Sequence, residues 1–202
     1  VEYRINDGSW FSTSGSSINV TGDDGEKTII VRQTDVAGNQ SETTSLTFTL
    51  DTTAPVAPTS ASLSTDSGAS ASDKITDTGQ VTVSGIESGA RVQYSLNNGV
   101  DWVSASAFSG SGFISLSGDG VKNLLIRQTD AAGNISDSAS FSFTLDTSAP
   151  ETLQLSLAKN SGSTSDSLTN DGTVTLAGLE EGATVEYRIN DGSWFSTSGS
   201  SI

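Results

Sequence analysis

The chain has 202 residues with no Cys, His or Met, and its 24 acidic and 9 basic side chains give a net charge of −15. Without Cys or His it has no disulfide framework, no thiolate zinc site and no cysteine or histidine catalytic group. The acidic excess argues against nucleic acid and anionic membranes as partners, and no apolar run reaches the roughly 20 residues of a membrane-inserted helix.

Long internal repeats organise the chain. Its first eighteen residues, VEYRINDGSWFSTSGSSI, return unchanged as Val185–Ile202. Two further segments, Val31–Pro55 and Val81–Ser95, return in altered form about 93 residues later. This period fits one small β-sandwich domain rather than a solenoid repeat of roughly 20 to 45 residues. Each repeat is therefore expected to be a whole domain with its own core.

The repeat predicts three pieces. Residues 1–51 form the C-terminal part of a domain with strands C to G, residues 52–146 a complete domain, and residues 147–202 an N-terminal part with strands A and B and the start of C. Each partial domain would expose an unpaired edge and half a core. Either a longer chain completes both parts, or the tail of one molecule completes the head of the next. The second contact is open-ended and would build fibres.

Alternation of apolar and polar residues predicts an all-β fold, because no segment shows a sustained helical period. The strands predicted for the complete domain, in Ig-type order, are Thr59–Ser64 (A), Gln80–Gly85 (B), Arg91–Leu96 (C), two weaker strands between Phe108 and Ser117 (D and E), Asn123–Thr129 (F) and Ser140–Leu145 (G). Seven short strands at this spacing are typical of a β-sandwich. The predicted architecture is a series of Ig-like sandwiches arranged end to end.

The same alternation predicts core-facing side chains in two strands. They are Val92, Tyr94 and Leu96 in strand C, and Phe141, Phe143 and Leu145 in strand G. Between strand C and Trp102, Asn98-Gly99 predicts a hairpin turn, since these residues adopt positive φ easily.

Trp102 follows that turn, and Trp10 and Trp194 stand at the equivalent places. We expect Trp102 to cap the core beside the hairpin. The alternative is an exposed aromatic ring that binds a ligand.

Acidic residues fall in loops at both ends of the predicted sandwich. One end holds the A–B loop, the E–F loop and the exit of strand G, with Asp66, Asp73, Asp77, Asp119 (matching Asp24) and Asp146 (matching Asp51). The other end holds the B–C and F–G loops, with Glu87 (matching Glu180), Asp130 (matching Asp35) and Asn134 (matching Asn39).

Stacked domains would bring both sets of acids together around each linker. Carboxylates crowded there repel one another unless a cation bridges them, and Ca²⁺ accepts six to eight oxygen ligands flexibly. The alternative is that Asp and Asn stand in these loops because they favour turns. Asp51 in DTTAP and Asp146 in DTSAP recur with Thr and Pro fixed around them, which favours bound Ca²⁺. The Pro residues of these linkers also restrict the backbone.

Four motifs, LDTTAP, TDVAGN, VTVSGIESGARVQYS and NNGVDW, resemble the Ig-like repeats of giant bacterial surface adhesins. These include biofilm-associated proteins and the large adhesins exported by type 1 secretion. The resemblance covers essentially the whole chain. It implies an extracellular stalk, rigidified by Ca²⁺, that holds an adhesive domain away from the cell and supports adhesion and biofilm formation.

The resemblance also implies calcium ligands at Asp51 and Asp146 and, through a looser match, at Asp35 and Asp130. The A–B loop varies between repeats: Asp73 matches Asp166, but Asp66 aligns with Asn160 and Asp77 with Asn170. A calcium site built there would differ in affinity from one repeat to the next.

Three classes of function compete on this sequence. Near-identity between repeats favours a structural spacer whose partners are its neighbouring repeats, because a specific binding site need not be copied along an array. The alternative is a module that binds carbohydrate or protein through aromatics such as Trp102 and Tyr94. Glycoside hydrolysis needs only two carboxylates, but a sandwich of this size predicts no deep pocket, so we predict no enzyme.

Overall fold

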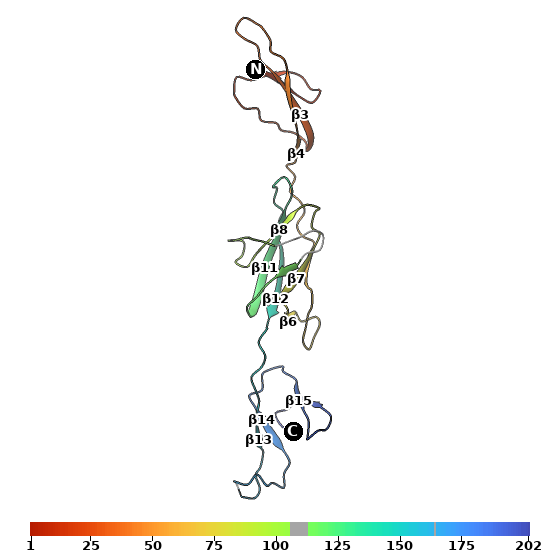
Figure 1. Ribbon diagram of the computed structural model, residues 1–202, viewed down its shortest axis with the longest axis vertical. Coiled ribbons are helices and arrows are strands. Elements are labelled where there is room, and N and C mark those ends of the chain that lie inside the picture. The colour runs from red at the N-terminus through yellow and green to blue at the C-terminus, as the bar shows by residue number, and fades with distance from the viewer. Residues whose placement is uncertain (106–112, 164) are drawn as a thin grey trace. The chain divides into compact units, whose positions relative to one another are not determined.

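The computed structural model describes residues 1–105, 113–163 and 165–202. Every element named in it is a β-strand (Figure 1), which confirms the all-β prediction. Within the described residues, no helix is long and apolar enough to cross a membrane. The chain divides into two compact units, Val1–Asp146 and Thr147–Ile202, and the second is called the C-terminal unit below.

Two facing sheets form the central sandwich, residues 60–145. One has three strands in the order β10 (Phe113–Ser115), β7 (Gln80–Ser84) and β5 (Ser60–Leu63). The other has five, in the order β6 (Ile75–Thr76), β12 (Ala139–Leu145), β11 (Gly120–Thr129), β8 (Arg91–Ser95) and β9 (Val103–Ser104). Strands A, B, C, E, F and G are thus found as β5, β7, β8, β10, β11 and β12. The part of the predicted D and E region within residues 106–112 lies outside the described residues.

Period-two alternation builds the core of the sandwich. Val81 and Val83 of β7 and Ile114 of β10 pack against the facing sheet, and each is at most 3% exposed. The facing sheet contributes Val92, Leu124, Ile126, Phe143 and Leu145. Phe141 and Tyr94 pack against this cluster while partly exposed, as predicted. Burial of each large side chain stabilises the fold by about 1.5–3 kcal/mol.

Two strands, β6 and β9, were not predicted. Each has only two residues, which is too short for alternation to show. β6 pairs with β12 in parallel: Thr144 N donates to Lys74 O at 2.8 Å and Asp146 N to Thr76 O at 2.9 Å. The chain therefore leaves the three-stranded sheet after β5 and joins the edge of the other sheet before it returns as β7.

The hairpin after β8 differs from the prediction at one residue. Asn98 (φ 56°) and Gly99 (φ 85°) form the predicted turn, and β8 pairs with β9 across it. Leu96, however, is 51% exposed, so its predicted place on the core face with Val92 and Tyr94 is wrong. The strand ends at Ser95, because the Ser95 hydroxyl accepts a hydrogen bond from Gly99 N (2.9 Å) and draws the chain into the turn.

Trp102 does not cap the core, and that prediction is also wrong. The Arg127 guanidinium carbon lies 3.9 Å from the centre of the Trp102 ring. Arg127 neighbours the buried Ile126 and so faces the outside of the five-stranded sheet. The indole N–H donates to Gly99 O at 3.0 Å. A cation–π contact and this hydrogen bond hold the ring on the outer face of the sheet.

The N-terminal sheet, residues 2–50, repeats half of this architecture. Its strands are β1 (Glu2–Ile5), β2 (Phe11–Ser12), β3 (Gly25–Arg32) and β4 (Thr44–Leu50), in the order β2-β1-β3-β4. This order matches β9-β8-β11-β12 of the central sandwich. With β9 named C′, after its place beside strand C, the four N-terminal strands are the counterparts of C′, C, F and G. The same aromatic contact recurs, with Arg32 lying 4.2 Å from the ring centre of Trp10.

The C-terminal unit carries the complementary strands. β13 (Gln154–Leu157) pairs with β14 (Val174–Ala177), and β15 (Val185–Tyr187) pairs with β16 (Phe195–Thr197). Ile202 and Val174 exchange two backbone hydrogen bonds, and Leu176 N donates to Ser200 O. Residues 200–202 therefore pair with β14 as β10 pairs with β7, and the unit holds counterparts of A, B, C, C′ and the start of E. The domain division predicted from the repeat stays a prediction.

Candidate functional site

Hydrogen bonds from the N-terminal side hold the linker that precedes the central sandwich. The carboxylate of Asp24, in the turn before β3, accepts bonds from the Thr52 backbone and hydroxyl, both at 2.8 Å, and from the Thr53 hydroxyl. Asp51 also accepts a bond from Thr53 N at 3.2 Å. The two linker threonines are therefore tied to the end of the N-terminal sheet.

The loop after β11 contacts the same linker from the sandwich. Asp130 Oδ1 accepts bonds from Gly133 N at 2.7 Å and Asn134 N at 2.8 Å, which closes the loop. The Asn134 side-chain amide then donates to Asp130 Oδ2 at 2.9 Å and to Asp51 O at 3.1 Å, with Asp51 Oδ1 at 3.4 Å. Asp51 and Asp130, two predicted calcium ligands, thus meet at the amide of Asn134.

A buried glutamine completes the attachment of the linker. Gln128 is fully buried, and its amide donates to Val56 O at 2.6 Å and Gly85 O at 3.1 Å. Its carbonyl oxygen accepts a bond from Glu87 N at 2.8 Å. Sequence reasoning missed this residue. The available signal was a polar residue at an inward position of strand F, present in both VRQTD and IRQTD.

These hydrogen bonds shift the pKa values of the acidic groups in the linker and its neighbouring loops. Bonds from the Thr53 and Thr52 side chains lower the pKa of Asp24. At Asp130, burial raises the pKa, but hydrogen bonds from Asn134 and Gly133 outweigh it and the net pKa is lowered. The side-chain and backbone hydrogen bonds of Asn39 lower the pKa of Asp35 in the corresponding loop. All three groups are therefore held as carboxylates.

Acid is expected to loosen this linker. Because the pKa of Asp24 and of Asp130 is lower in the folded state, their stabilisation is complete above about pH 5 and is lost as pH falls below about 3.9, through the folded pKa. NMR signals of the Thr52 and Thr53 amides should shift in that range. Asp24→Asn should abolish the shift. Amide signals that shift equally in the parent chain and in Asp24→Asn would contradict the role given to Asp24.

The A–B loop holds Asp66 and Asp73, two further predicted ligands. Asp66 Oδ2 accepts a bond from Lys74 N at 3.1 Å, and Asp73 Oδ1 one from Ile75 N at 3.0 Å. The other carboxylate oxygen of Asp66 is buried and has no hydrogen-bond partner. The side-chain oxygen of Asn160, at the matching place in the C-terminal unit, is also buried without a partner.

The remaining predicted ligands lie in separate loops. Asp35 binds Asn39 within its own loop, and the backbone oxygens of Glu87 and Glu180 close equivalent turns with Ala90 and Ala183. Asp119 O accepts a bond from Lys122 Nζ at 3.4 Å, and Asp146 N belongs to the β6–β12 pairing. Throughout residues 1–105, 113–163 and 165–202, no three acidic side chains form a group that could hold a metal.

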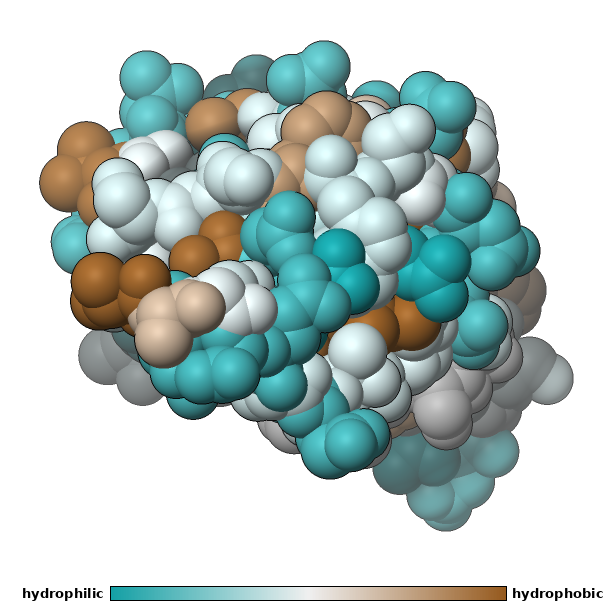
Figure 2. Space-filling model, turned by 90° about the horizontal axis from the view of Figure 1, so that it is seen from above, coloured by the Kyte–Doolittle hydropathy of each residue, from teal (hydrophilic) through white to brown (hydrophobic). Residues whose placement is uncertain are grey.

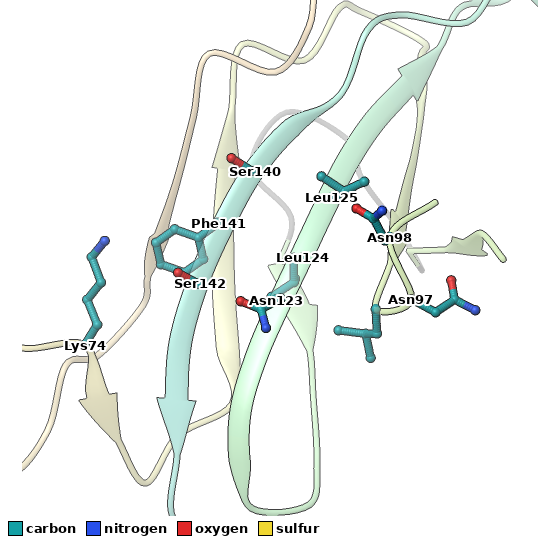
Figure 3. Close-up of a pocket in the computed structure, with 10 residues that line it drawn as sticks. Lys74, Asn97, Asn98, Asn123, Leu124, Leu125, Ser140, Phe141 and Ser142 are labelled. Carbon is teal, nitrogen blue, oxygen red and sulfur yellow. The ribbon is translucent and has the colours of Figure 1, made fainter. Parts of the chain in front are cut away.

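A groove of about 700 Å³ lies beside β11 and β12. Figure 3 shows Asn97 and Asn98 of the turn on one side and Lys74 with Phe141 on the other. Ser140, Ser142 and Asn123 add further polar groups to its lining. Trp102 and Tyr94, the aromatics considered for ligand binding, are not among the lining residues.

Residues 53–147 match a family model described as a bacterial Ig-like domain. The matched segment contains every strand of the central sandwich, from β5 to β12. No curated protein matches the chain.

Proposed function

We propose that this chain is a stalk segment of a bacterial surface protein, in which Ig-like sandwiches follow one another along restrained linkers. The observation that carries the proposal is the linker at residues 51–56. Asp24 binds it from the N-terminal sheet, and Asn134 and Gln128 bind it from the sandwich. A flexible linker would not form hydrogen bonds to the domains on both sides, whereas a spacer of constant length depends on a linker restrained in this way. The match to bacterial Ig-like domains is consistent with a spacer in a surface protein. We propose in addition that the stalk is extracellular and serves cell adhesion and biofilm formation.

We further propose that Ca²⁺ binds at this linker. Asp51 O, Asp51 Oδ1 and Asp130 Oδ2 all lie within 3.4 Å of one atom, the amide nitrogen of Asn134. A hard cation attracts the oxygens that this N–H group attracts. Rotation of the Asn134 amide by half a turn would add its own oxygen as a ligand. Asp146, the counterpart of Asp51, is the candidate ligand in the following linker.

A second calcium position is proposed in the A–B loop. The unpartnered oxygens of Asp66 and Asn160 support it, because a buried oxygen acceptor without a donor costs about 1–3 kcal/mol. A carboxylate attracts a divalent cation more strongly than an amide does. We therefore expect tighter binding at Asp66 than at Asn160.

Calcium should stabilise the chain and stiffen its linkers. At a hundredfold excess over Kd, a ligand specific to the folded state adds about 2.7 kcal/mol of stability, so the melting temperature should rise with Ca²⁺ and fall with chelator. Asp51→Ala or Asp146→Ala should broaden the distribution of dimensions seen by small-angle scattering but spare the sandwich, because a linker carboxylate is outside the core. Asp137→Ala, which removes another exposed carboxylate, is the control.

If chelator changes neither the melting temperature nor the scattering profile, the calcium proposal is wrong. If Asp51→Ala leaves the scattering profile of the parent chain unaltered, Asp51 does not restrain the linker.

A further inference from the structure

The groove beside β11 and β12 differs from the rest of the surface in the chemistry of its lining. Of the described residues that line it, Lys74 is the only charged one, although the chain carries 24 acidic side chains. Hydrophilic and weakly polar residues cover most of the face seen in Figure 2, so polarity alone does not distinguish the groove. Its volume of about 700 Å³ does, because small-ligand sites enclose about 300–1,000 Å³.

Side chains from two paired strands form the base of the groove. Asn123 and Leu125 of β11 alternate with the buried Leu124 and therefore point away from the core. Ser142 and Ser140 of β12 are their direct partners across the sheet (Figure 3). The base thus combines one apolar side chain with an amide and two hydroxyls on the outer face of the five-stranded sheet.

Most of the polar groups in the groove are free to bind a ligand. Asn97 is engaged within the turn, where its amide donates to the Asp101 carboxylate at 2.7 Å and its oxygen accepts from the Ser95 hydroxyl at 2.8 Å. Four other side chains of the lining form no hydrogen bond with any described residue: Asn98, Asn123, Ser140 and Ser142. Each offers both a donor and an acceptor.

The N-terminal sheet shows the same place in a closed form. Thr28 and Thr47 occupy the positions of Asn123 and Ser142, and their hydroxyls bond each other at 2.8 Å. Asn6 N donates to Thr28 O at 2.7 Å, and Asn6 Oδ1 accepts a bond from Thr28 N at 2.8 Å. The first hairpin therefore stays attached to β3, and the polar groups there are already paired.

A longer turn opens the groove in the central sandwich. Between its Tyr and its Trp, the central hairpin has one residue more than the first hairpin. β1 stays paired with β3 as far as Ile5, whereas β8 pairs with β11 only as far as Ser95, the counterpart of Arg4. Leu96, the counterpart of Ile5, is released from pairing and lines the groove. The groove is thus a feature of this repeat and not of the fold in general.

We propose that the groove binds a short neutral oligosaccharide. Free amides and hydroxyls suit sugar hydroxyls, which also donate and accept hydrogen bonds, and Leu125 offers an apolar surface to the C–H groups of a sugar ring. The net charge of −15 repels anionic ligands. A cationic ligand finds Lys74 and no carboxylate among the described lining residues.

An extended peptide fits this groove less well than a sugar chain. β11 and β12 pair with each other along all the residues that they contribute to the lining. They leave no row of free backbone groups, which a bound peptide strand requires. The proposal adds a ligand to the central sandwich and does not depend on the stalk function or on calcium.

An NMR titration of the whole chain tests the proposal. The probes are maltotetraose, cellotetraose and mannotetraose, with tetragalacturonate and an uncharged octapeptide for comparison. Concentrations up to about 10 mM would detect a Kd of about 1 mM. At least one neutral sugar should shift the side-chain amide signals of Asn98 and Asn123 in a saturable way. The signals of Thr28 and Thr47, where the same place is closed, should not shift.

A double variant closes the groove by a contact that the chain already contains. Asn123→Thr with Ser142→Thr copies the bonded pair Thr28–Thr47, so the sandwich should keep its fold. Because the two hydroxyls would bond each other, the affinity for the sugar should fall at least about tenfold. Ser115→Thr, at an exposed position on β10 of the facing sheet, is the control and should leave the affinity unchanged.

Saturable shifts at the groove that are lost in the double variant and kept in Ser115→Thr would support the proposal. Three results would overturn it: no shift with any of the three neutral sugars, equal affinity in the parent chain and the double variant, or tighter binding of tetragalacturonate or of the octapeptide. None of these results bears on the calcium and scattering experiments, which test the stalk function separately.

Discussion

Replacement of Gln128 by leucine is expected to destabilise the central sandwich by about 3 kcal/mol. The side chain is fully buried and bonds Val56 O, Gly85 O and Glu87 N. Leucine is close in volume, so the main loss is that of the three hydrogen bonds, each of which contributes about 0.5–1.5 kcal/mol to stability. Residue 56 should become mobile as well, because its carbonyl loses its bond to the sandwich.

Amide hydrogen exchange resolved by mass spectrometry measures this effect for each part of the chain separately. Peptides from β7 and β11 should lose protection, while those from β13 and β14 should not. Gln93→Leu is the matched control, because Gln93 lies on the outer face and its amide bonds only the Arg127 side chain among the described contacts. Gln93→Leu should lower the free energy of unfolding by less than about 1 kcal/mol. Equal effects of the two substitutions would contradict the role of Gln128.

Gly79→Ala should destabilise the sandwich by at least about 3 kcal/mol. A Cβ atom at this position would stand 2.1 Å from Leu116 O and 2.9 Å from Leu116 C. Both are backbone atoms of the segment after β10, and Leu116 N donates to Gly79 O at 2.7 Å. The collision cannot be relieved by a side-chain rotation, so the two segments must separate and lose this bond.

Gly172 provides the control for Gly79. It stands at the same place in the repeat, yet a Cβ atom there would meet nothing within 4 Å. Gly172→Ala should therefore change stability by less than about 0.5 kcal/mol. Exchange rates of β7 and β14 peptides in the two variants give the comparison. A well-protected β7 in Gly79→Ala would show that the Leu116 segment moves aside at little cost.

Sequence reasoning predicted the strands that carry long alternating patterns. β11, β12, β7 and β8 were found within three residues of the predicted ends, because their side chains alternate between a dry core and water. It missed β6, whose two residues are defined by pairing with β12 and not by their own composition. The pairing at this sheet edge is a tertiary contact, and the local sequence of two residues does not predict it.

At the linker, the sequence indicated which acids matter but not what they bind. Asp51 and Asp130 do meet, through Asn134. Asp24 binds two threonine hydroxyls, a partnership that depends on how the turn before β3 folds back on the linker. The prediction that Trp102 caps the core was wrong because the position of its ring also depends on a tertiary contact. An aromatic residue next to a hairpin fits either face of a sheet, and the cation on the neighbouring strand, Arg127, decides which.

The parallel pairing of β6 with β12 has a mechanical consequence. The chain enters the sandwich through β5 and β6 and leaves it through β12. A pull on the two ends of the domain therefore drags β6 and β12 in opposite directions along their length. The bonds Thr144 N to Lys74 O and Asp146 N to Thr76 O cross between the strands, so both carry the load at once and must break together. A domain held in this way resists tension applied at its two ends, because neither hydrogen bond can break before the other is loaded.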